Sequence, residues 1–323
     1  MFVLKSVSFL ILSICFTLVE VEAQSKKHQS TRKPVTHTQT RIQTSIIADA
    51  HTGTVLYSEN AEHNIYPASL TKMMTLYMIF DALKSKKISL NTMLPVSKHA
   101  QGMRPSKLGL VKGQKISVGD AIMALIVKSA NDVAVVVAEG IGGTESGFAY
   151  KMNHQAKALG MHKTHFVNAS GWHDAHQVTT AVDMAKLGLA LKRDFPQYYP
   201  LFKKTSFTFC GQVINGHNHV LKQYAGAEGL KTGYTVPAGF NLVTTASKNG
   251  MSLIGVVTGG SSAKTRDRKM ISLLDKYFGV ENVNYDALDR KTKVVNKKSI
   301  NKNGRHHKMI ASNVANKKRM KRV

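Results

Sequence analysis

The segment SLTKMMTLYMIFDAL occupies residues 69–83 and is apolar around almost its whole circumference when it is drawn as a helix. A helix on the surface of a protein carries polar residues along one face, whereas a helix that is apolar on all sides belongs inside a core. Pro67 stands just before this segment, and Lys84 lies near its end. The sequence therefore predicts a buried helix over residues 69–83, with the other elements packed around it.

Ser69 and Lys72 lie three residues apart on this helix, so they share one face and their hydroxyl and amine can meet. Serine is a poor nucleophile until a neighbouring base takes its proton. A lysine can be that base if burial and nearby cations lower its pKa, and Lys231 is a candidate for the second cation. The Ser69 N–H, at the start of the helix, can help to hold an oxyanion. The structural alternative is a capping serine followed by a surface lysine.

The motif Ser129-Ala130-Asn131 stands in a break between two predicted helices, where a loop can direct side chains into a cleft. There Ser129 can relay a proton toward a leaving amine, and Asn131 can hold a substrate amide. The structural alternative is a plain interhelical turn in which Asn131 or Asp132 caps the second helix.

The motif Lys231-Thr232-Gly233 lies in a segment typical of a strand, residues 229–235. An extended peptide can pair with an edge strand, and Gly233 lets the two backbones approach closely. Lys231 and Thr232 can bind an anionic C-terminus, and the Tyr234 N–H would complete an oxyanion hole. Standing alone, the motif is equally compatible with an ordinary turn lysine.

Turn signals and periodicity predict strands at both ends of the domain and helices between them. Asn249-Gly250 joins two alternating segments, residues 241–248 and 251–258, and is the strongest short signal for a hairpin. A further hairpin is predicted from residues 45–48 and 54–57. Helices are predicted over residues 69–83, 117–126, 132–139, 145–159, 180–193 and 264–278. This order favours an α+β fold whose antiparallel sheet is built from segments distant in the sequence.

The three motifs, in this order and these contexts, resemble the D-alanyl-D-alanine carboxypeptidases, which are low-molecular-weight penicillin-binding proteins and serine peptidases of the S11 type. The resemblance covers residues 44–280 and includes PASLTKMMT at residues 67–75. Residues 158–161, 164–166 and 183–185 are also similar to that family. The resemblance implies a serine β-lactamase/transpeptidase-like fold, in which helices flank an antiparallel sheet and form a helical subdomain.

The family resemblance also implies a chemistry. Ser69 would attack the carbonyl between two D-alanines of a peptidoglycan stem peptide, D-alanine would leave, and water would hydrolyse the ester. β-Lactams would acylate the same serine. Arg266, which follows Gly259-Gly260, matches a family arginine that helps to bind the terminal carboxylate. No cofactor and no metal are implied.

Three other functions are alternatives to this one. A D,D-endopeptidase that cleaves peptidoglycan crosslinks is the nearest alternative, and the residues Asp132 and Tyr234 that follow the second and third motifs favour the carboxypeptidase. A class A β-lactamase is disfavoured because no glutamate is placed to activate a deacylating water. A non-catalytic cell-wall-binding protein remains an alternative from another class, although the motif residues are intact.

The ends of the chain predict export. Residues 1–23 are typical of a secretory signal peptide with cleavage after Ala23, residues 24–43 of a flexible basic linker, and residues 281–323 of a basic, disordered tail. The catalytic domain would occupy residues 44–280. The expected location is therefore periplasmic or extracytoplasmic, with possible membrane association.

The chain is strongly basic, with 45 Lys and Arg against 19 Asp and Glu. This balance suits an anionic membrane or wall polymer, which the tail would contact peripherally. Nucleic acid is not expected as a partner, because the export signal argues against it and the tail lacks aromatic residues that stack on bases. Once the signal peptide has left, Cys210 has no partner for an internal disulfide. The histidines lack a metal-binding pattern.

Overall fold

The computed structural model describes residues 41–279. Five strands form one antiparallel sheet in the order β2-β1-β9-β8-β7. These strands are β1 (Thr44–Asp49), β2 (Val55–Glu59), β7 (Ala227–Thr235), β8 (Gly239–Lys248) and β9 (Met251–Gly260). β1 pairs with β9, about 200 residues later in the sequence. The predicted α+β class and the antiparallel sheet assembled from distant segments are thereby confirmed.

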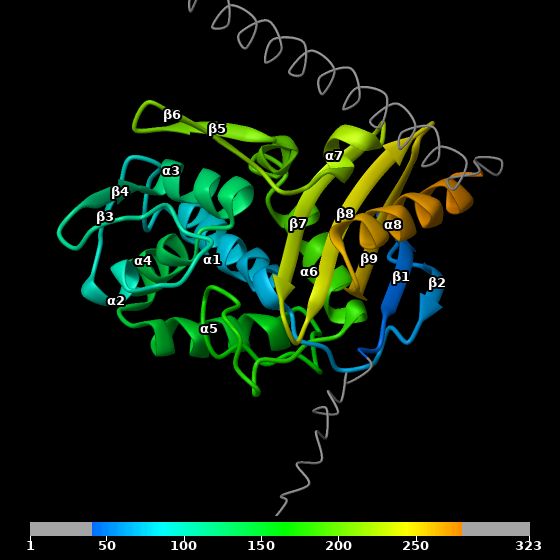
Figure 1. Ribbon diagram of the computed structural model, residues 1–323, viewed down its shortest axis with the longest axis horizontal. Coiled ribbons are helices and arrows are strands. Elements are labelled where there is room, and N and C mark those ends of the chain that lie inside the picture. The colour runs from blue at the N-terminus through cyan, green and yellow to red at the C-terminus, as the bar shows by residue number, and fades with distance from the viewer. Residues whose placement is uncertain (1–40, 280–323) are drawn as a thin grey trace, which may run out of the picture. The chain divides into compact units, whose positions relative to one another are not determined.

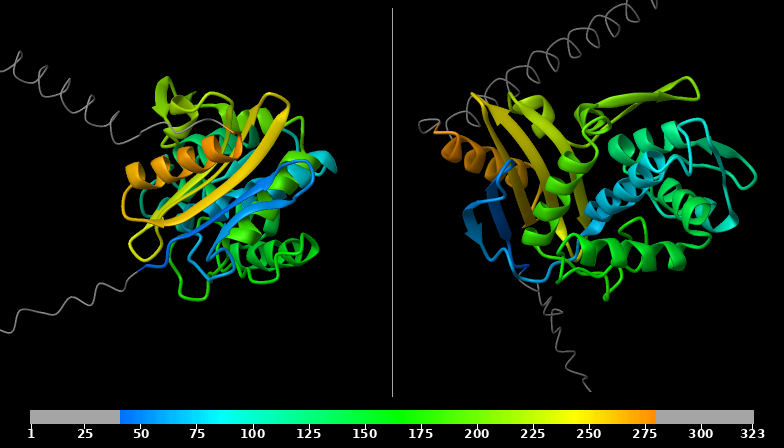
Figure 2. Two further views of the ribbon diagram at one scale, coloured as in Figure 1. Left: turned by 90° about the vertical axis from the view of Figure 1, so that its right-hand side faces the viewer. Right: turned by 180° about the vertical axis from the view of Figure 1, so that it is seen from behind.

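Helices cover both faces of this sheet (Figures 1 and 2). α8 (Ala263–Tyr277) packs on one face, chiefly against β9 and β8. α6 (Ala181–Asp194) packs against β9, β1 and β8, and Figure 2 shows it on the opposite face from α8. Each face of the sheet is apolar because each is covered, so Leu242, Val243, Leu253, Ile254 and Val256 are all fully buried.

A group of helices lies beyond the β7 edge of the sheet (Figure 1). Its central member is α1 (Lys72–Lys84), which contacts α4, α5 and α6. The other helices of this group are α2 (Lys98–Gln101), α3 (Val118–Met123), α4 (Asn131–Gly142) and α5 (Glu145–Ala158). Met73, Leu76, Ile79 and Phe80 of α1 have no exposed surface. The prediction of a buried helix is confirmed.

The start of that helix differs in one respect from the prediction. Ser69 lies in a 3-10 turn, Ala68–Thr71, and the α-helix begins only at Lys72. The Leu70 N–H donates to the Pro67 carbonyl at 3.2 Å, the i→i+3 spacing that often tightens the first turn of a helix. The spacing of three residues still brings Ser69 and Lys72 together, because a 3-10 turn repeats every three residues.

Most predicted helix ends and turns are found where the sequence placed them. Ser117 and Thr180 cap their helices by accepting hydrogen bonds from the N–H groups of Asp120 and Asp183. Asn249 and Gly250 both have positive φ in the β8–β9 turn. The helix predicted to end at Ile126 continues as a π-helical turn, Ala124–Lys128.

Several short elements were not predicted. They are the antiparallel pair β3 and β4 (Met93–Pro95 and Lys115–Ser117), the hairpin β5–β6 (Ser206–Phe209 and Gln212–Asn215), the helix α7 (Val220–Gln223) and α2. Strands of three or four residues are too short to show a clear alternation. Cys210, at the β5–β6 turn, is exposed and forms no disulfide with any residue between 41 and 279.

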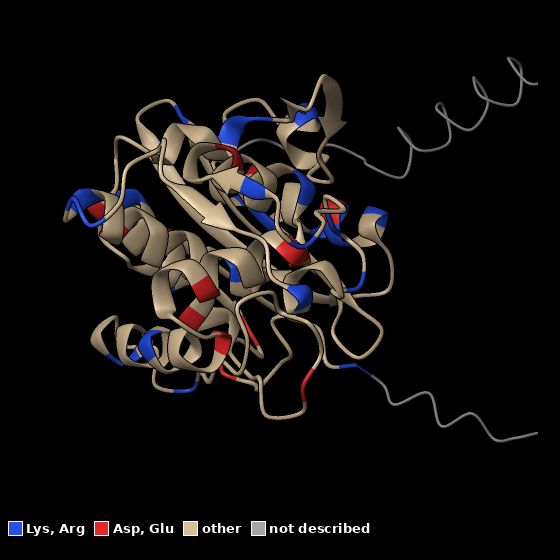
Figure 3. Cartoon of the chain, turned by 90° about the vertical axis from the view of Figure 1, so that its left-hand side faces the viewer, with Lys and Arg blue, Asp and Glu red and all other residues tan. Residues whose placement is uncertain are grey.

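Parts of the predicted organisation lie outside the described residues. The signal peptide at residues 1–23, most of the linker at residues 24–43 and the tail at residues 281–323 are among them, and residues 41–43 carry no regular secondary structure. None of the helices between residues 41 and 279 is both long enough and apolar enough to cross a membrane. Figure 3 shows basic and acidic residues intermixed on the face that the helical group presents.

A substitution at Phe80 tests how much the burial of α1 contributes to the free energy of unfolding. Its ring is fully buried, and its centroid lies 4.9 Å from that of Tyr198 and 5.6 Å from that of Phe195. Phe80→Ala is expected to lower the free energy of unfolding by about 3–5 kcal/mol, because the substitution leaves a cavity. Val213→Ala, at a position that is 67% exposed, is the control and should change it by less than about 0.5 kcal/mol. Urea denaturation measures the free energy of unfolding of both variants. Equal losses in Phe80→Ala and Val213→Ala would contradict the central position of α1.

Candidate active site

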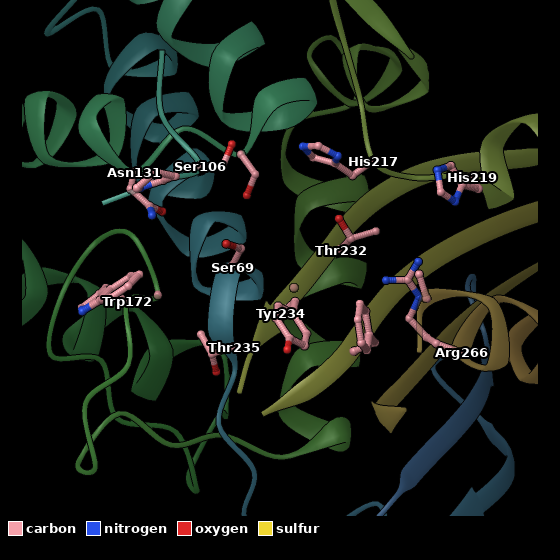
Figure 4. A pocket seen from close by; sticks show the side chains of 16 residues that line it. Ser69, Ser106, Asn131, Trp172, His217, His219, Thr232, Tyr234, Thr235 and Arg266 are labelled. Atoms are coloured by element: carbon pink, nitrogen blue, oxygen red, sulfur yellow. The ribbon is translucent and has the colours of Figure 1, made fainter. Parts of the chain in front are cut away.

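A cleft of about 380 Å³ lies where the helical group meets the β7 edge of the sheet, and it holds most of the predicted site residues (Figure 4). Its lining residues are Ser69, Pro105, Ser106, Ser129, Asn131, Gly171, Trp172, His217, His219, Thr232, Gly233, Tyr234, Thr235, Phe240, Ala263 and Arg266. Lys72 and Lys231 are not among the lining residues. Both are buried behind the cleft wall.

The Lys72 amine lies at the centre of the polar contacts behind the cleft. Its Nζ is 3.1 Å from Ser69 Oγ, 2.7 Å from Asn131 Oδ1 and 2.5 Å from the Ser170 carbonyl oxygen. Asn131 Oδ1 and the carbonyl can only accept, so the amine donates to both. A neutral amine has two N–H groups and one lone pair, which leaves the lone pair for the Ser69 hydroxyl proton. The structure therefore brings Ser69, Lys72 and Asn131 together as the sequence predicted.

Burial determines the charge of this amine. Lys72 has no exposed surface, and its desolvation lowers the pKa of the amine well below the ordinary value of 10.5. The nearby charge of Lys231 lowers the Lys72 pKa further, whereas Asp132 raises it. Burial and Lys231 therefore shift this pKa in the same direction, and the role of Lys72 as a base stays a prediction. A lysine whose pKa is lowered is better suited to accept a proton than an ordinary lysine.

The second motif forms the wall opposite β7. Ser129 ends the π-helical turn in the left-handed conformation, with φ of 60°. Its side chain is 7% exposed, and among the described residues its Oγ has no hydrogen-bond partner. A buried hydroxyl without a partner is uncommon, and it leaves Ser129 free to bond a molecule in the cleft. Asn131 is held more firmly, because its Nδ2 donates to the Arg104 carbonyl at 2.9 Å.

Asp132 fixes the loop that completes this wall. Its carboxylate is fully buried and accepts hydrogen bonds from the N–H groups of Leu108, Gly109 and Leu110, at 2.8–3.1 Å. The same loop places Ser106 on the cleft, and the Ser106 carbonyl accepts from the Asn131 N–H at 2.7 Å. Asp132 is thus the anchor of a loop and not simply the helix cap considered from the sequence.

The third motif lies on an edge strand, as predicted, because β7 is the last strand in the sheet order. A Cβ added to Gly233 would be 3.0 Å from the Pro67 carbonyl and 3.1 Å from the Ser69 backbone nitrogen. Only glycine allows β7 to come this close to the turn that carries Ser69. Tyr234 follows on the cleft wall, and its half-exposed ring lies 4.3 Å from that of Phe240. The use of the Tyr234 N–H in an oxyanion hole stays a prediction.

The cationic side of the cleft differs in detail from the sequence-based expectation. Thr232 and Arg266 line the cleft, but Lys231 is only 2% exposed and its Nζ donates to the Thr232 carbonyl at 2.9 Å. Burial, with the charge of Arg266, lowers the pKa of Lys231 to about 7. In this geometry Thr232 and Arg266 are better placed than Lys231 to contact an anion. Direct binding of a carboxylate by Lys231 stays a prediction.

Arg266 is fixed by its neighbours. Its Nε and Nη2 donate to Asp267 Oδ1 at 2.9 and 2.7 Å, and its Nη1 donates to the Asn241 carbonyl at 3.2 Å. His217 and His219 lie near Arg266 and Thr232 in the cleft (Figure 4). Burial, followed by the charges of Lys231 and Lys128, lowers the pKa of His217.

The loop that closes the cleft was not predicted from the sequence. Ser170 supplies the carbonyl that bonds Lys72, and Gly171 and Trp172 line the cleft beside it. A Cβ on Gly171 would lie 1.8 Å from the Ala68 carbonyl oxygen, and φ there is +80°. The only Trp of the chain, next to a glycine, was the one available signal. The Ser170 carbonyl could not be predicted, because every residue has a backbone carbonyl. Between residues 41 and 279, no cluster of three His, Cys, Asp or Glu side chains could hold a metal ion.

The antiparallel sheet covered on both faces, the helical group at its edge and the serine and lysine between them define a serine β-lactamase/transpeptidase-like domain. Residues 28–262 match the family described as D-alanyl-D-alanine carboxypeptidase. The chain belongs to this family of serine peptidases, and the predicted resemblance and fold class are confirmed.

Individual relatives agree with this assignment. The D-alanyl-D-alanine carboxypeptidase DacC of Escherichia coli (strain K12) is 37% identical over 236 residues, which are 71% of this chain and 59% of that protein. Penicillin binding protein 5 from Haemophilus influenzae superimposes with a TM-score of 0.71 at 36% identity, over 74% of this chain and 71% of that one.

Penicillin-Binding Protein D2 from Listeria monocytogenes, solved in its cefotaxime-bound form, superimposes with a TM-score of 0.66 at 29% identity, over 72% of this chain and 95% of that one. The chain spans 61, 68 and 59% of the length of the first three curated relatives, which are longer proteins.

Lys231 gives this site a measurable effect on stability. Its pKa is about 7 in the folded protein and near 10.5 when unfolded, so between these values only the unfolded chain holds the proton. The free energy of unfolding should therefore rise with pH over this range, by up to about 1.4 kcal/mol per pH unit from this residue. Urea denaturation at pH 7, 8 and 9 should show a shallower rise in Lys231→Met. Lys248→Met, at an exposed position, controls for the loss of one lysine; equal slopes in wild type and Lys231→Met would contradict the burial argument.

Proposed function

We propose that this protein is a serine D,D-carboxypeptidase that removes the terminal D-alanine from peptidoglycan pentapeptides. The observation that carries the proposal is the buried Lys72 amine, which contacts Ser69 Oγ while its donors are taken by Asn131 and Ser170. A hydroxyl next to a base of lowered pKa is the arrangement that activates a serine nucleophile. Membership in the D-alanyl-D-alanine carboxypeptidase family supports the same chemistry.

In the proposed first step, the Ser69 proton moves to the Lys72 lone pair as Oγ bonds to the carbonyl carbon between the two D-alanines. The negative charge develops on the carbonyl oxygen. The backbone N–H groups of Ser69 and Tyr234 would hold that oxygen, and the close approach of Gly233 to the Ser69 turn supports this pairing.

The tetrahedral intermediate then expels the terminal D-alanine. The C–N bond breaks, and the leaving nitrogen takes a proton that began on Ser69 and passes from Lys72 through the Ser129 hydroxyl. The buried Ser129 Oγ, which has no partner among the described residues, is suited to this relay. The product is an ester between Ser69 and the shortened peptide. Water hydrolyses this ester to release the peptide and restore the hydroxyl, again with Lys72 as the base.

The direction of the bound peptide follows from the charges of the cleft. The substrate would lie antiparallel to the β7 edge, and the amide of Asn131 has capacity for one further bond at each end. The terminal carboxylate would lie at the cationic end, with Thr232 and Arg266 as its contacts and Lys231 behind them. A β-lactam would occupy the same place, and the related Listeria protein, solved with cefotaxime bound, supports this.

A D,D-endopeptidase would use the same serine and lysine. Its substrate differs in the leaving group: a crosslinked peptide takes the place of a free terminal D-alanine. The cationic end, formed by Arg266 on the cleft wall with Lys231 behind it, favours a substrate that ends in a carboxylate. We further propose that the protein acts outside the cytoplasm, because its substrate is there. The segment that predicts export, residues 1–23, lies outside the described residues.

The role of Lys72 is tested by labelling with a fluorescent penicillin. Lys72→Ala should slow acylation on the order of 100- to 10 000-fold, the usual contribution of a general base, while the circular dichroism spectrum stays that of the wild type. Lys98→Ala, at an exposed position, is the matched control and should label normally. Full labelling of Lys72→Ala would identify another group as the base. If the wild type shows no label that depends on Ser69, the protein is a non-catalytic wall-binding protein.

The choice between carboxypeptidase and endopeptidase is tested with two substrates. Free D-alanine released from a pentapeptide should exceed cleavage of a crosslinked muropeptide dimer. Arg266→Ala should reduce the first activity through KM, because the terminal carboxylate loses a contact. Preferential cleavage of the dimer would overturn the carboxypeptidase assignment in favour of the endopeptidase.

A further inference from the structure

Ala169 and Ser170 form a fully buried backbone segment beside Lys72, and all four of their polar backbone groups have side-chain partners. The Ala169 N–H donates to Glu145 Oε1 at 3.0 Å, and the Ala169 carbonyl accepts from Thr75 Oγ1 at 2.6 Å. The Ser170 N–H donates to Asn168 Oδ1 at 3.2 Å. The Ser170 carbonyl accepts from Lys72 Nζ at 2.5 Å. The position of this carbonyl is therefore set by side chains that do not touch the cleft.

Glu145 is the charged member of these partners and the one that comes from the outer side of the helical group. It opens α5, where a carboxylate is favoured by the helix dipole, and its side chain is 15% exposed. Its second oxygen, Oε2, lies 3.5 Å from His99 Nε2, and His99 Nδ1 lies 3.4 Å from Glu139 Oε1. Glu145 thus connects a surface group to the loop that contacts the base.

We propose that Glu145 is a positioning residue for Lys72: it holds Ala169 and Ser170 so that the Ser170 carbonyl takes one N–H of the amine. Asn131 takes the other N–H, so the lone pair is directed at Ser69 Oγ. Without the Ser170 carbonyl the amine is free to rotate, and its lone pair is no longer aimed at the hydroxyl. This inference rests on the proposed function and adds a residue to it that none of the three motifs contains.

The same contact predicts a change in pH dependence. A carbonyl that accepts from the amine stabilises the ammonium form, so its loss should lower the Lys72 pKa further. The charged groups acting on Lys72 are Lys231 and Asp132, and neither is altered by a change at Glu145. Acylation requires the neutral amine, so the acidic limb of its pH profile should move to lower pH while the plateau rate falls.

Two conservative variants separate the hydrogen bond from the charge. Glu145→Gln keeps an oxygen that reaches the Ala169 N–H but loses the charge, whereas Glu145→Asp keeps the charge but is one methylene too short. Labelling with a fluorescent penicillin should be slowed on the order of ten- to a hundredfold in Glu145→Asp, with the shifted acidic limb. Glu145→Gln and the control His99→Ala should remain near wild type. Wild-type rates in Glu145→Asp, or a loss only in Glu145→Gln, would overturn the proposal.

A second measurement does not depend on acylation. The titration of Lys72 is followed by NMR of the 13C-labelled lysine side chain in wild type and in Glu145→Asp, with Lys72→Met used to assign the signal. A lower midpoint in Glu145→Asp is expected, and an unchanged midpoint would refute the positioning role. If the wild type is not acylated by penicillin at all, the proposed function fails, and this titration still decides the role of Glu145.

Discussion

The burial of the Lys72 amine away from solvent is the constraint on which the site depends. Lys72 has no exposed surface, and burying a charged amine is costly unless it gives up its proton. The apolar surroundings that stabilise α1 therefore also lower the pKa of Lys72. Lys231 adds to the effect, because it is buried as well and lies close enough to disfavour a second positive charge. One property, the exclusion of water around α1, contributes both to the stability of the fold and to the lowered pKa of Lys72.

The cleft is formed by segments that are distant in the sequence, and buried polar side chains fix the positions of these segments. Asp132 fixes the loop that carries Ser106, and Glu145 and Asn168 fix the loop that carries Ser170. Asn241 of β8 donates to the Tyr66 carbonyl at 3.1 Å and accepts from the Gly259 N–H at 3.0 Å, which ties the Ser69 turn to the sheet. Each anchor uses a side chain to satisfy backbone groups that have no partner in a regular element.

Much of this arrangement could be read from the sequence, because it is carried by side chains with local signatures. The apolar helix, the Asn249-Gly250 turn and the capping residues Ser117 and Thr180 are properties of adjacent residues. Each is present in the structure, although the α-helix begins at Lys72 and not at Ser69. Ser69 and Lys72 were paired by spacing alone. The Ser170 carbonyl, the anchoring by Glu145 and the burial of Lys231 depend on contacts between residues far apart in the chain. No local pattern encodes such contacts, so the structure was needed to find them.

The central claim is that Ser69 is the hydroxyl whose proton the neutral Lys72 amine accepts. It is tested most directly by mass spectrometry of the intact protein after exposure to benzylpenicillin at neutral pH, followed by peptide mapping of the adduct. The account predicts a single covalent adduct, on the peptide that contains Ser69, and none in Lys72→Arg, whose guanidinium cannot give up its proton. An adduct on Ser129 or Ser170, or an unchanged adduct in Lys72→Arg, would contradict it.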